Sequence, residues 1–486
     1  MRIAFDNSYA QLPDEFFRRI PLEAPKAPHL IRWNQALADH LEIDTEAQAP
    51  DAIAAALSGG SAIDGAQPIA MAYAGHQFGG FVPQLGDGRA VLLGEVLGRD
   101  EKRYDIHLKG SGRTPFSRRG DGKSALGPAL REYIVSESMA ALGIPTTRAL
   151  AVVGTGETVY RDEPKPGAIF ARIARSHIRI GTFEYFAARE QPESLRTLLD
   201  YTLRRLYPER ADSENPALAL LDAVIERQAT LIAQWMRVGF IHGVMNTDNM
   251  NLSGETIDFG PCAFLDEYNP AKVFSSIDQH GRYAYHAQGQ IGLWNLTRFA
   301  EALLPLIDTD QDRAVERAKE TLERYPKRHS EALRCELVSK IGLDTVDEDA
   351  IELIERLLRL MEAEGVDFTL FFHQLTHGLE TGEPSLASGL FRDPQAIELW
   401  IQKWRARVDS EDRDTVTDRM RRANPVRIPR NHRIEAAIES AENGDFALFH
   451  RMVEAMDSPY EPRPQFSEYE IPPKVEERVA ATFCGT

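Results

Sequence analysis

The stretch Phe240–Pro261 (F-I-H-G-V-M-N-T-D-N-M-N-L-S-G-E-T-I-D-F-G-P) holds the residue types with the most chemistry. Protein kinases place two metal ligands in similar stretches, the Asn of H-R-D-x-x-x-x-N and the Asp of D-F-G. Here His242 is followed at the kinase offset by Asn249, and Asp258 opens a D-F-G triplet. Asn and Asp supply the oxygen ligands that Mg²⁺ takes alongside substrate phosphates. The spacing therefore predicts Asn249 and Asp258 as metal ligands.

The residue that would act as the base is displaced in this stretch. Val244 stands where a kinase has its catalytic aspartate, and Asp248 directly precedes Asn249. An Asp-Asn pair also forms ordinary Asx turns, and D-F-G alone is a short motif. The joint spacing of these pieces favours a catalytic loop in which Asp248 serves as the base.

A lysine and a glutamate could form a second part of the site. Lys109 follows the predicted strand Tyr104–Leu108, and Glu132 lies within the predicted helix Ala125–Leu142. Kinases pair a strand lysine with a glutamate of the following helix to hold phosphates. The alternative is an exposed ion pair, which contributes about 0–1 kcal/mol and has no further meaning.

Two arginines and two glycine-rich turns are further candidates. Arg172 and Arg179 lie in A-R-I-A-R-S-H-I-R-I-G, where two planar guanidinium groups could bind one polyanion or could simply be solvated. Backbone could approach phosphates in the turns Q-L-G-D-G-R and G-D-G-K, but Asp-Gly is also a common hairpin turn, and the residues alone favour that reading. The candidates in these turns are Gly86, Gly88, Arg89, Asp121 and Gly122.

The elements that must position these residues predict an α+β fold. Between Pro68 and Lys109 glycines punctuate short β-prone runs, two strands follow the helix after it, and after about Thr182 helical spacing dominates. We expect a small mixed N-lobe over residues 1–180, a mainly helical C-lobe over residues 181–486 with an irregular tail from about residue 460, and a ligand cleft between them. The predicted strands are Val91–Leu93, Tyr104–Leu108, Ala149–Val153 and Ala168–Ile173, and the pair Thr256-Ile257 is also strand-like. The predicted helices are Ala125–Leu142, Leu195–Tyr207 and Ala217–Val238, together with one from Leu30 to Leu41.

Composition excludes several classes of protein. The 486 residues include 56 Lys and Arg against 74 Asp and Glu, and the net charge of −18 argues against a general nucleic-acid binder. Three scattered cysteines are too few for a disulfide framework or a zinc site and suit a reducing compartment. No stretch has the apolar length of a secretion signal or a membrane span, so we expect a cytoplasmic protein without a membrane partner.

Long stretches across the chain resemble the selenoprotein O family, protein adenylyltransferases with a pseudokinase fold. The resemblance is carried by A-Y-A-G-H-Q-F-G-G-F-V-P-Q-L-G-D-G-R-A (72–90), K-G-S-G-R-T-P-F-S-R-R-G-D-G-K (109–123), H-G-V-M-N-T-D-N-M (242–250), I-D-F-G-P (257–261) and N-P-V-R-I-P-R-N-H (424–432). It implies a two-lobed, kinase-like fold that binds ATP in reversed orientation, so that AMP is transferred and pyrophosphate leaves.

The resemblance also implies roles for individual residues. Asp248 would be the proton acceptor, Asn249 and Asp258 the ligands of Mg²⁺ or Mn²⁺, and Glu132 the ion-pair partner of Lys109. The residues implied in binding ATP are Gly86, Gly88, Arg89, Lys109, Asp121, Gly122, Arg172, Arg179 and Asp258. The acceptors would be Ser, Thr or Tyr hydroxyls of proteins, including the enzyme itself.

The chain departs from the family pattern at its redox positions. Cys484 lies where members carry a selenocysteine or cysteine, but Phe274 occupies the region where bacterial members often have the second cysteine of a redox disulfide. Cys262 is a possible substitute partner, and Phe259 replaces a tyrosine that is common in the triplet.

Two other functions are compatible with the same residues. In one, Asp248 serves a phosphotransferase that moves the γ-phosphate. In the other, the protein is a scaffold that binds nucleotide without catalysis, although Asn249 and Asp258 argue against it because a scaffold needs no metal pair.

Overall fold

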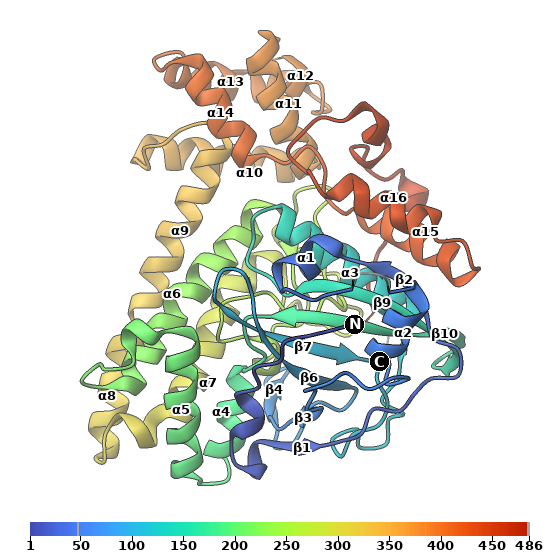
Figure 1. The fold of residues 1–486 in the computed structure, drawn as a ribbon. Helices are drawn as coiled ribbons and strands as arrows, with labels where there is room; N and C mark the ends of the chain where they lie inside the picture. The colour runs from blue at the N-terminus through green and yellow to red at the C-terminus, as the bar shows by residue number, and fades with distance from the viewer. Residues whose placement is uncertain (46–47, 384, 484–486) are drawn as a thin grey trace.

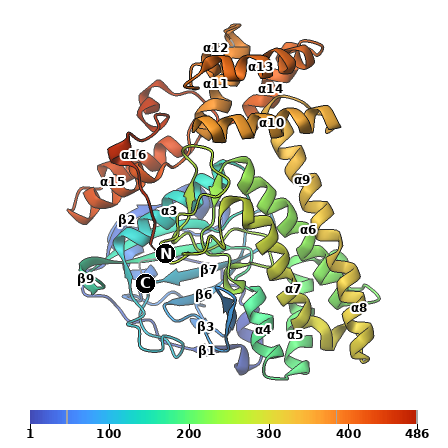
Figure 2. The ribbon, with the colours of Figure 1, turned by 180° about the vertical axis from the view of Figure 1, so that it is seen from behind.

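The computed structural model describes residues 1–45, 48–383 and 385–483 (Figure 1). A twisted antiparallel sheet lies beside a large group of helices, and the view from behind shows the same arrangement (Figure 2). The α+β class and the kinase-like order of a sheet-containing N-terminal part and a helical C-terminal part are thus confirmed. Cys484 lies outside the described residues.

The main sheet has the strand order β1-β3-β6-β7-β10-β9-β2, with β8 paired to β10. Neighbouring residues of β6, Leu92 and Leu93, belong to two different apolar clusters, because successive side chains of a strand point to opposite faces. Both faces are therefore covered, which explains why β6 is nearly all apolar. The strands are β1 Phe17–Arg19, β2 His29–Trp33, β3 Ile69–Met71, β4 Gly75–Gln77, β5 Gly80–Val82, β6 Ala90–Leu97, β7 Arg103–Lys109, β8 Ser124–Ala125, β9 Arg148–Tyr160, β10 Pro164–Ala174, β11 Phe240–Ile241 and β12 Ala263–Phe264.

Helix α3 packs on one face of this sheet, and most other helices follow β10 in the chain (Figure 1). Helix α9 leads away from the body of the molecule to the group α10–α14, drawn in orange. The helices are α1 Gln35–His40, α2 Pro50–Leu57, α3 Leu126–Ala141, α4 Ile180–Ala187, α5 Pro192–Leu206, α6 Pro216–Arg237, α7 Gln288–Ile307, α8 Gln311–Leu322, α9 Arg324–Lys340, α10 Glu348–Glu364, α11 Phe368–Thr381, α12 Ser385–Ser388, α13 Pro394–Val408, α14 Arg413–Ala423, α15 Asn431–Glu442 and α16 Ala447–Met456.

The C-terminal helices α15 and α16 return to α3, so segments far apart in sequence lie side by side (Figures 1 and 2). Arg131 on α3 donates to Asn431 Oδ1 on α15 and to the carbonyl of Cys262, each at 3.2 Å. The ring of Tyr133 on α3 meets Phe449 on α16 with centroids 5.7 Å apart. These contacts fix α3, which carries Glu132, from the side opposite the sheet.

Two local expectations are wrong. The helix expected from Leu30 to Leu41 is the strand β2 followed by the short α1, because residues 29–33 pair with β9 at the sheet edge. Thr256-Ile257 forms no strand, since Thr256 makes a single parallel bridge to Thr146. In both places tertiary pairing overrides the local pattern.

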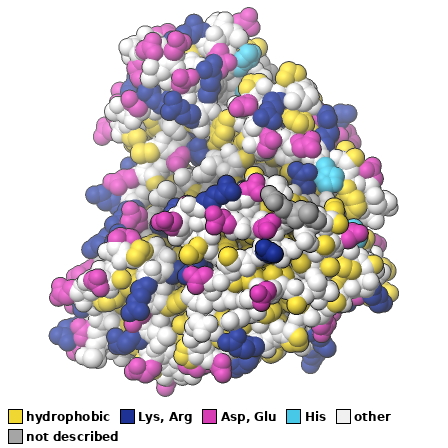
Figure 3. All heavy atoms as spheres, in the orientation of Figure 1, with side chains coloured by type: hydrophobic (Ala, Val, Ile, Leu, Met, Phe, Trp, Pro, Cys, Tyr) yellow, Lys and Arg dark blue, Asp and Glu magenta, His cyan; other side chains and the backbone are white. Residues whose placement is uncertain are grey.

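The surface mixes charges of both signs. On the face shown in Figure 3, basic and acidic side chains are interspersed over the whole visible area. In the described ranges no helix combines the length and apolarity that crossing a bilayer requires.

Candidate active site

A cavity of about 440 Å³ lies between the sheet and the loop that follows β11. It collects side chains from β6, β7, β10, the segment before α4 and that loop. Of the predicted residues, the cavity is lined by Gly86, Gly88, Arg89, Lys109, Arg172, Arg179, Asp248, Asn249 and Asp258. Residues distant in sequence thus surround one space large enough for a nucleotide.

Lys109 is held between two carboxylates. Its Nζ lies 2.6 Å from Glu132 Oε2 on α3 and 2.5 Å from Asp258 Oδ1. The predicted pair of Lys109 and Glu132 therefore exists, although Glu132 holds the lysine from behind and does not line the cavity. Both residues are buried, so the pair acts in a region where charge interactions are screened little.

Asp258 is ionised and conformationally unusual. Burial alone would raise its pKa, but the cations Lys109, Arg89 and Arg172 outweigh burial and hold the pKa well below its usual range. Its φ of 68° lies in the left-handed region, which aspartate visits more readily than most residues. Such backbone is retained where the surroundings determine it, often at functional sites.

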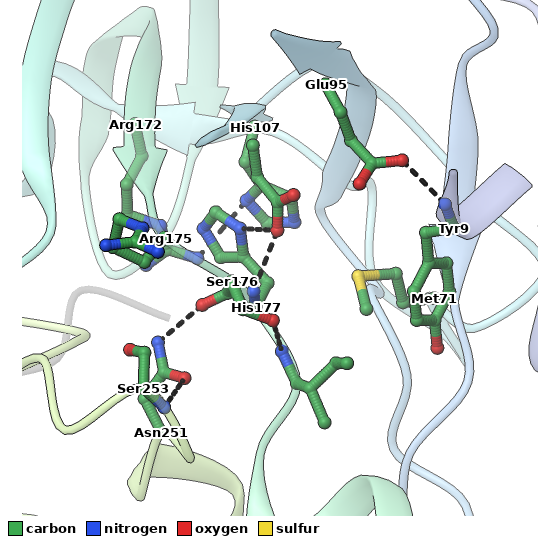
Figure 4. A network of polar contacts seen from close by, with 12 residues as sticks. Tyr9, Met71, Glu95, His107, Arg172, Arg175, Ser176, His177, Asn251 and Ser253 are labelled. Carbon is green, nitrogen blue, oxygen red and sulfur yellow. Dashed lines mark hydrogen bonds and ion pairs between the residues drawn. The ribbon is translucent and has the colours of Figure 1, made fainter. Parts of the chain in front are cut away.

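A buried chain of polar contacts positions Arg172 from behind (Figure 4). Arg172 donates to Glu132 Oε1 at 3.0 Å and to His107 Nδ1 at 3.2 Å. His107 Nε2 lies 3.2 Å from Asp87 Oδ2, and the imidazole stacks on His177 with centroids 4.2 Å apart. Burial lowers the pKa of His107, so its neutral ring accepts from Arg172 and donates to Asp87.

Arg179 links the cavity to the loop that follows β11. Its guanidinium donates to the backbone carbonyl of Asp248 at 3.2 Å and lies 4.4 Å from the centroid of the Tyr73 ring. Asp87 Oδ1 lies 3.8 Å from it. Arg172 and Arg179 thus line one space, where Arg172 is paired with Glu132 through one guanidinium nitrogen and Arg179 lies near Asp87.

Asp248 is buried in the 3₁₀ turn Thr247–Asn249. Burial raises its pKa to about 6, against the opposing effect of Arg179. Its Oδ2 accepts a 3.3 Å hydrogen bond from Gln77 Nε2, and its Oδ1 accepts none from the residues that the structure describes. A carboxylate with a pKa close to neutrality and spare acceptor capacity is suited to take a proton.

Asn249 and Asp258 fit a hard divalent cation. Asn249 Nδ2 donates to the carbonyl of Val244 at 3.0 Å, which leaves the amide oxygen as the atom that can face the cavity. Asp258 lines the same cavity in its ionised form. Two oxygen donors are too few for a cation alone, so phosphate oxygens and water would complete the coordination.

The hairpin of β4 and β5 covers the loop that follows β11, a contact that sequence reasoning missed. The backbone N–H of His76 donates to Thr247 Oγ1 at 2.7 Å, and the N–H of Phe78 donates to Asn246 Oδ1 at 3.0 Å. Glu184 Oε1 lies 2.5 Å from His76 Nδ1, and its Oε2 accepts from Thr247 at 2.5 Å. His76 thus helps to hold Thr247, the residue next to Asp248. The available signal was the glycine-rich run A-G-H-Q-F-G-G.

Asp121 and Gly122 are not among the residues that line the cavity. Asp121 is paired with Arg161, whose guanidinium nitrogens lie 3.0 and 3.1 Å from its two carboxylate oxygens. Gly122 accepts from the N–H of Gly112 in the neighbouring loop. Their part in nucleotide binding stays a prediction.

Comparison with known proteins adds to this geometry. A family model described as protein adenylyltransferase SelO matches residues 1–457. A protein nucleotidyltransferase YdiU of Rhizobium johnstonii is 57% identical over 488 residues, covering 99% of this chain and 97% of its own length. The protein of the same description from Rhizobium etli is 56% identical over 489 residues, with 99% and 97% covered. One from a Bradyrhizobium species is 54% identical over 486 residues, with 99% of each chain covered.

Proposed function

Since the chain belongs to the protein adenylyltransferase SelO family, we propose that its cavity transfers AMP from ATP to hydroxyl groups of proteins, with Asp248 as the base. The chain is a nucleotidyltransferase by this membership and by its likeness to the YdiU proteins. The protein acceptors, the metal and the roles of single residues are part of the proposal.

One observation carries the assignment of roles. Asp248, with its raised pKa, lines the same cavity as a group of cationic side chains and the two candidate metal ligands. The predicted residues among these cations are Arg89, Lys109, Arg172 and Arg179. They would bind the triphosphate, whose charge they match, while Asp248 receives the proton of the incoming hydroxyl.

In the proposed reaction the acceptor oxygen attacks the α-phosphorus of ATP. A bond forms between these two atoms, the bond from the α-phosphorus to the bridging oxygen of the β-phosphate breaks, and pyrophosphate leaves. The hydroxyl proton passes to Asp248. Lys109, fixed by Glu132, and Arg172, fixed by His107, stay charged and in place, so little reorganisation is needed when negative charge develops.

Asn249 and Asp258 would hold Mg²⁺ or Mn²⁺. When bound, the metal supplies a positive charge that offsets the charge on the phosphates. Lys109 already occupies Asp258 Oδ1 in this structure. The remaining lone pairs of that carboxylate and the amide oxygen of Asn249 are the atoms offered to the cation.

The proposed base predicts a pH dependence. Because burial raises the pKa of Asp248 to about 6, the ionised form that accepts a proton is lost as the pH falls through about 6. We expect kcat/KM for AMP transfer to rise with pH and to level off about one unit above that value. The measurement is initial transfer rate from pH 5 to 8 at constant ionic strength, with Asp248→Asn as the comparison. A flat profile in the wild type would remove Asp248 from this role.

A glycine in the hairpin offers a steric test. A Cβ on Gly75 would lie 2.7 Å from Asp248 Oδ1 and 3.0 Å from Asp248 Cβ, so Gly75→Ala must displace the carboxylate. We expect the transfer rate to fall by up to about 100-fold, since small displacements of catalytic groups cost that much. Gly80→Ala is the matched control, because its Cβ would meet only the carbonyl of Gln77, at 3.5 Å. Equal rates in the two variants would contradict the close fit.

The reaction itself is tested with ATP labelled on either the α- or the γ-phosphate. The purified protein is incubated with each label and Mg²⁺ or Mn²⁺, and label retained on protein is measured together with released pyrophosphate. We expect retention from the α-position alone, with one pyrophosphate released for each AMP bound. Retention from the γ-position alone would make the protein a phosphotransferase and overturn the proposal. Retention from neither, even with mixed protein acceptors added, would leave nucleotide binding without transfer.

A further inference from the structure

A second hollow of about 950 Å³ adjoins the active-site cavity. One wall is the segment 277–282, and the other is the N-terminal half of α7. Phe78 and Ile277 line both spaces, so they form the ridge between them. We call the second hollow the α7 groove.

The rim of the α7 groove exposes large apolar side chains. Phe78 and Ile277 are 38% and 58% exposed, which is uncommon for residues of this size. Phe78 also has a φ of 50°, in the left-handed region that disfavours a bulky residue. Apolar side chains gathered beside a site, with a strained aromatic among them, are typical of a surface that contacts a protein.

The wall of the α7 groove carries a cation with spare donors. The guanidinium of Arg282 lies 4.6 Å from the centroid of the Trp294 ring. Its Nε and one terminal nitrogen are buried and make no hydrogen bond with the described residues. Asp278, which also lines the groove, is engaged by the backbone N–H groups of Arg282 and Tyr283, at 2.9 and 2.7 Å. Buried donors of this kind gain most from a charged acceptor.

The groove is tied to the catalytic loop through one side chain. Asn246 Oδ1 accepts from the N–H of Phe78 at 3.0 Å and from the hydroxyl of Tyr283 at 2.7 Å. Gln77, the neighbour of Phe78, donates to Asp248. A chain segment lying in the groove would therefore have a fixed position relative to Asp248.

We propose that the α7 groove binds an extended segment of the acceptor protein, with an Asp or Glu beside the acceptor hydroxyl paired to Arg282 and an apolar side chain resting on Phe78 and Ile277. This inference rests on the proposed function and names the local chemistry of its protein substrate. The apolar rim favours a polypeptide over a second nucleotide, and the unpaired donors of Arg282 favour an acidic one.

The test uses three peptides with one central serine, identical except that the neighbouring residues are Asp, Asn or Lys. Transfer of α-labelled AMP by the full-length wild type is measured for each at several salt concentrations. We expect kcat/KM for the acidic peptide to exceed that for the neutral one by about 10-fold and to fall with added salt. Equal rates for all three peptides would overturn the inference.

A charge reversal separates recognition from folding. Arg282→Glu should reverse the order and favour the Lys peptide, a gain that a damaged fold cannot produce. Arg334→Glu, an exposed change of the same charge on α9, is the matched control and should keep the acidic preference. Loss of ATP affinity in Arg282→Glu, measured by calorimetry, would assign Arg282 to the nucleotide and overturn the inference. If the wild type labels itself but shows no preference among the peptides, the inference about the α7 groove is refuted and the proposed function stands. If no protein or peptide is labelled, the proposed function is refuted.

Discussion

Replacing Asp248 with asparagine or alanine is expected to abolish most AMP transfer while ATP still binds. The expected loss in transfer rate is about 10²–10⁴-fold, the usual contribution of a general base. ATP affinity should change little, because Asp248 forms no ion pair with Arg89, Lys109 or Arg172 in the cavity. Transfer is measured with α-labelled ATP and affinity by calorimetry with the same metal.

Stability should change in the opposite direction to activity in Asp248→Asn. Burial raises the pKa of Asp248 from its ordinary value to about 6, so the ionised carboxylate opposes folding at neutral pH. When the carboxyl is protonated this cost is absent, so the fold is more stable at about pH 4 than at neutral pH. The extra stability is lost as the pH rises from about 4 through 6. Asparagine removes the charge and should raise the free energy of unfolding at pH 7.5 by up to about 3 kcal/mol.

The control for this pair of results is Asp312→Asn, an exposed aspartate on α8 far along the chain from the site. It should leave both transfer and unfolding unchanged. Equal loss of ATP affinity and of transfer in Asp248→Asn would show that this carboxylate binds nucleotide and would remove it from the role of base.

The parts of the site that lie in one stretch were predictable from sequence. Asp248, Asn249 and Asp258 follow one another within a single loop, so their spacing alone places them near one space. Lys109 and Glu132 were predictable as well, because a strand followed by one helix gives few ways to arrange the pair. In both cases a short connection limits the geometry.

The remaining parts of the site depend on pairing between distant segments. His107 reaches Asp87 and Arg172 only because β7 lies between β6 and β10 in the sheet. The hairpin residue His76 meets Thr247 across a gap of 171 residues, and no local pattern encodes that contact. For the same reason residues 29–33, which have helical spacing, form a strand once β9 offers its edge.

Asp258→Asn is expected to weaken both ATP binding and transfer, in contrast to Asp248→Asn. Asp258 carries the negative charge that Lys109, Arg89 and Arg172 surround, and it is one of the two proposed metal ligands. The asparagine keeps the shape but loses the charge, so we expect the affinity for ATP with metal to fall by at least about 10-fold. The transfer rate at saturating ATP should fall as well, because the metal would be held by Asn249 without a charged partner.

The two substitutions should also differ in stability, and this difference tests the electrostatic argument independently of catalysis. The pKa of Asp258 is depressed, so its ionised form stabilises the fold above the pKa it has when unfolded, and that contribution is lost as the pH falls through the depressed value. Asp258→Asn should therefore lower the midpoint of thermal unfolding at pH 7.5, where Asp248→Asn raises it. Below about pH 6 the Asp248 that Asp258→Asn retains becomes protonated and no longer destabilises the fold. The difference between the unfolding midpoints of the two variants should therefore narrow as the pH is lowered from 7.5 to 4. Shifts of the same sign in both variants would contradict the charge assignment of the cavity, even if both lost activity.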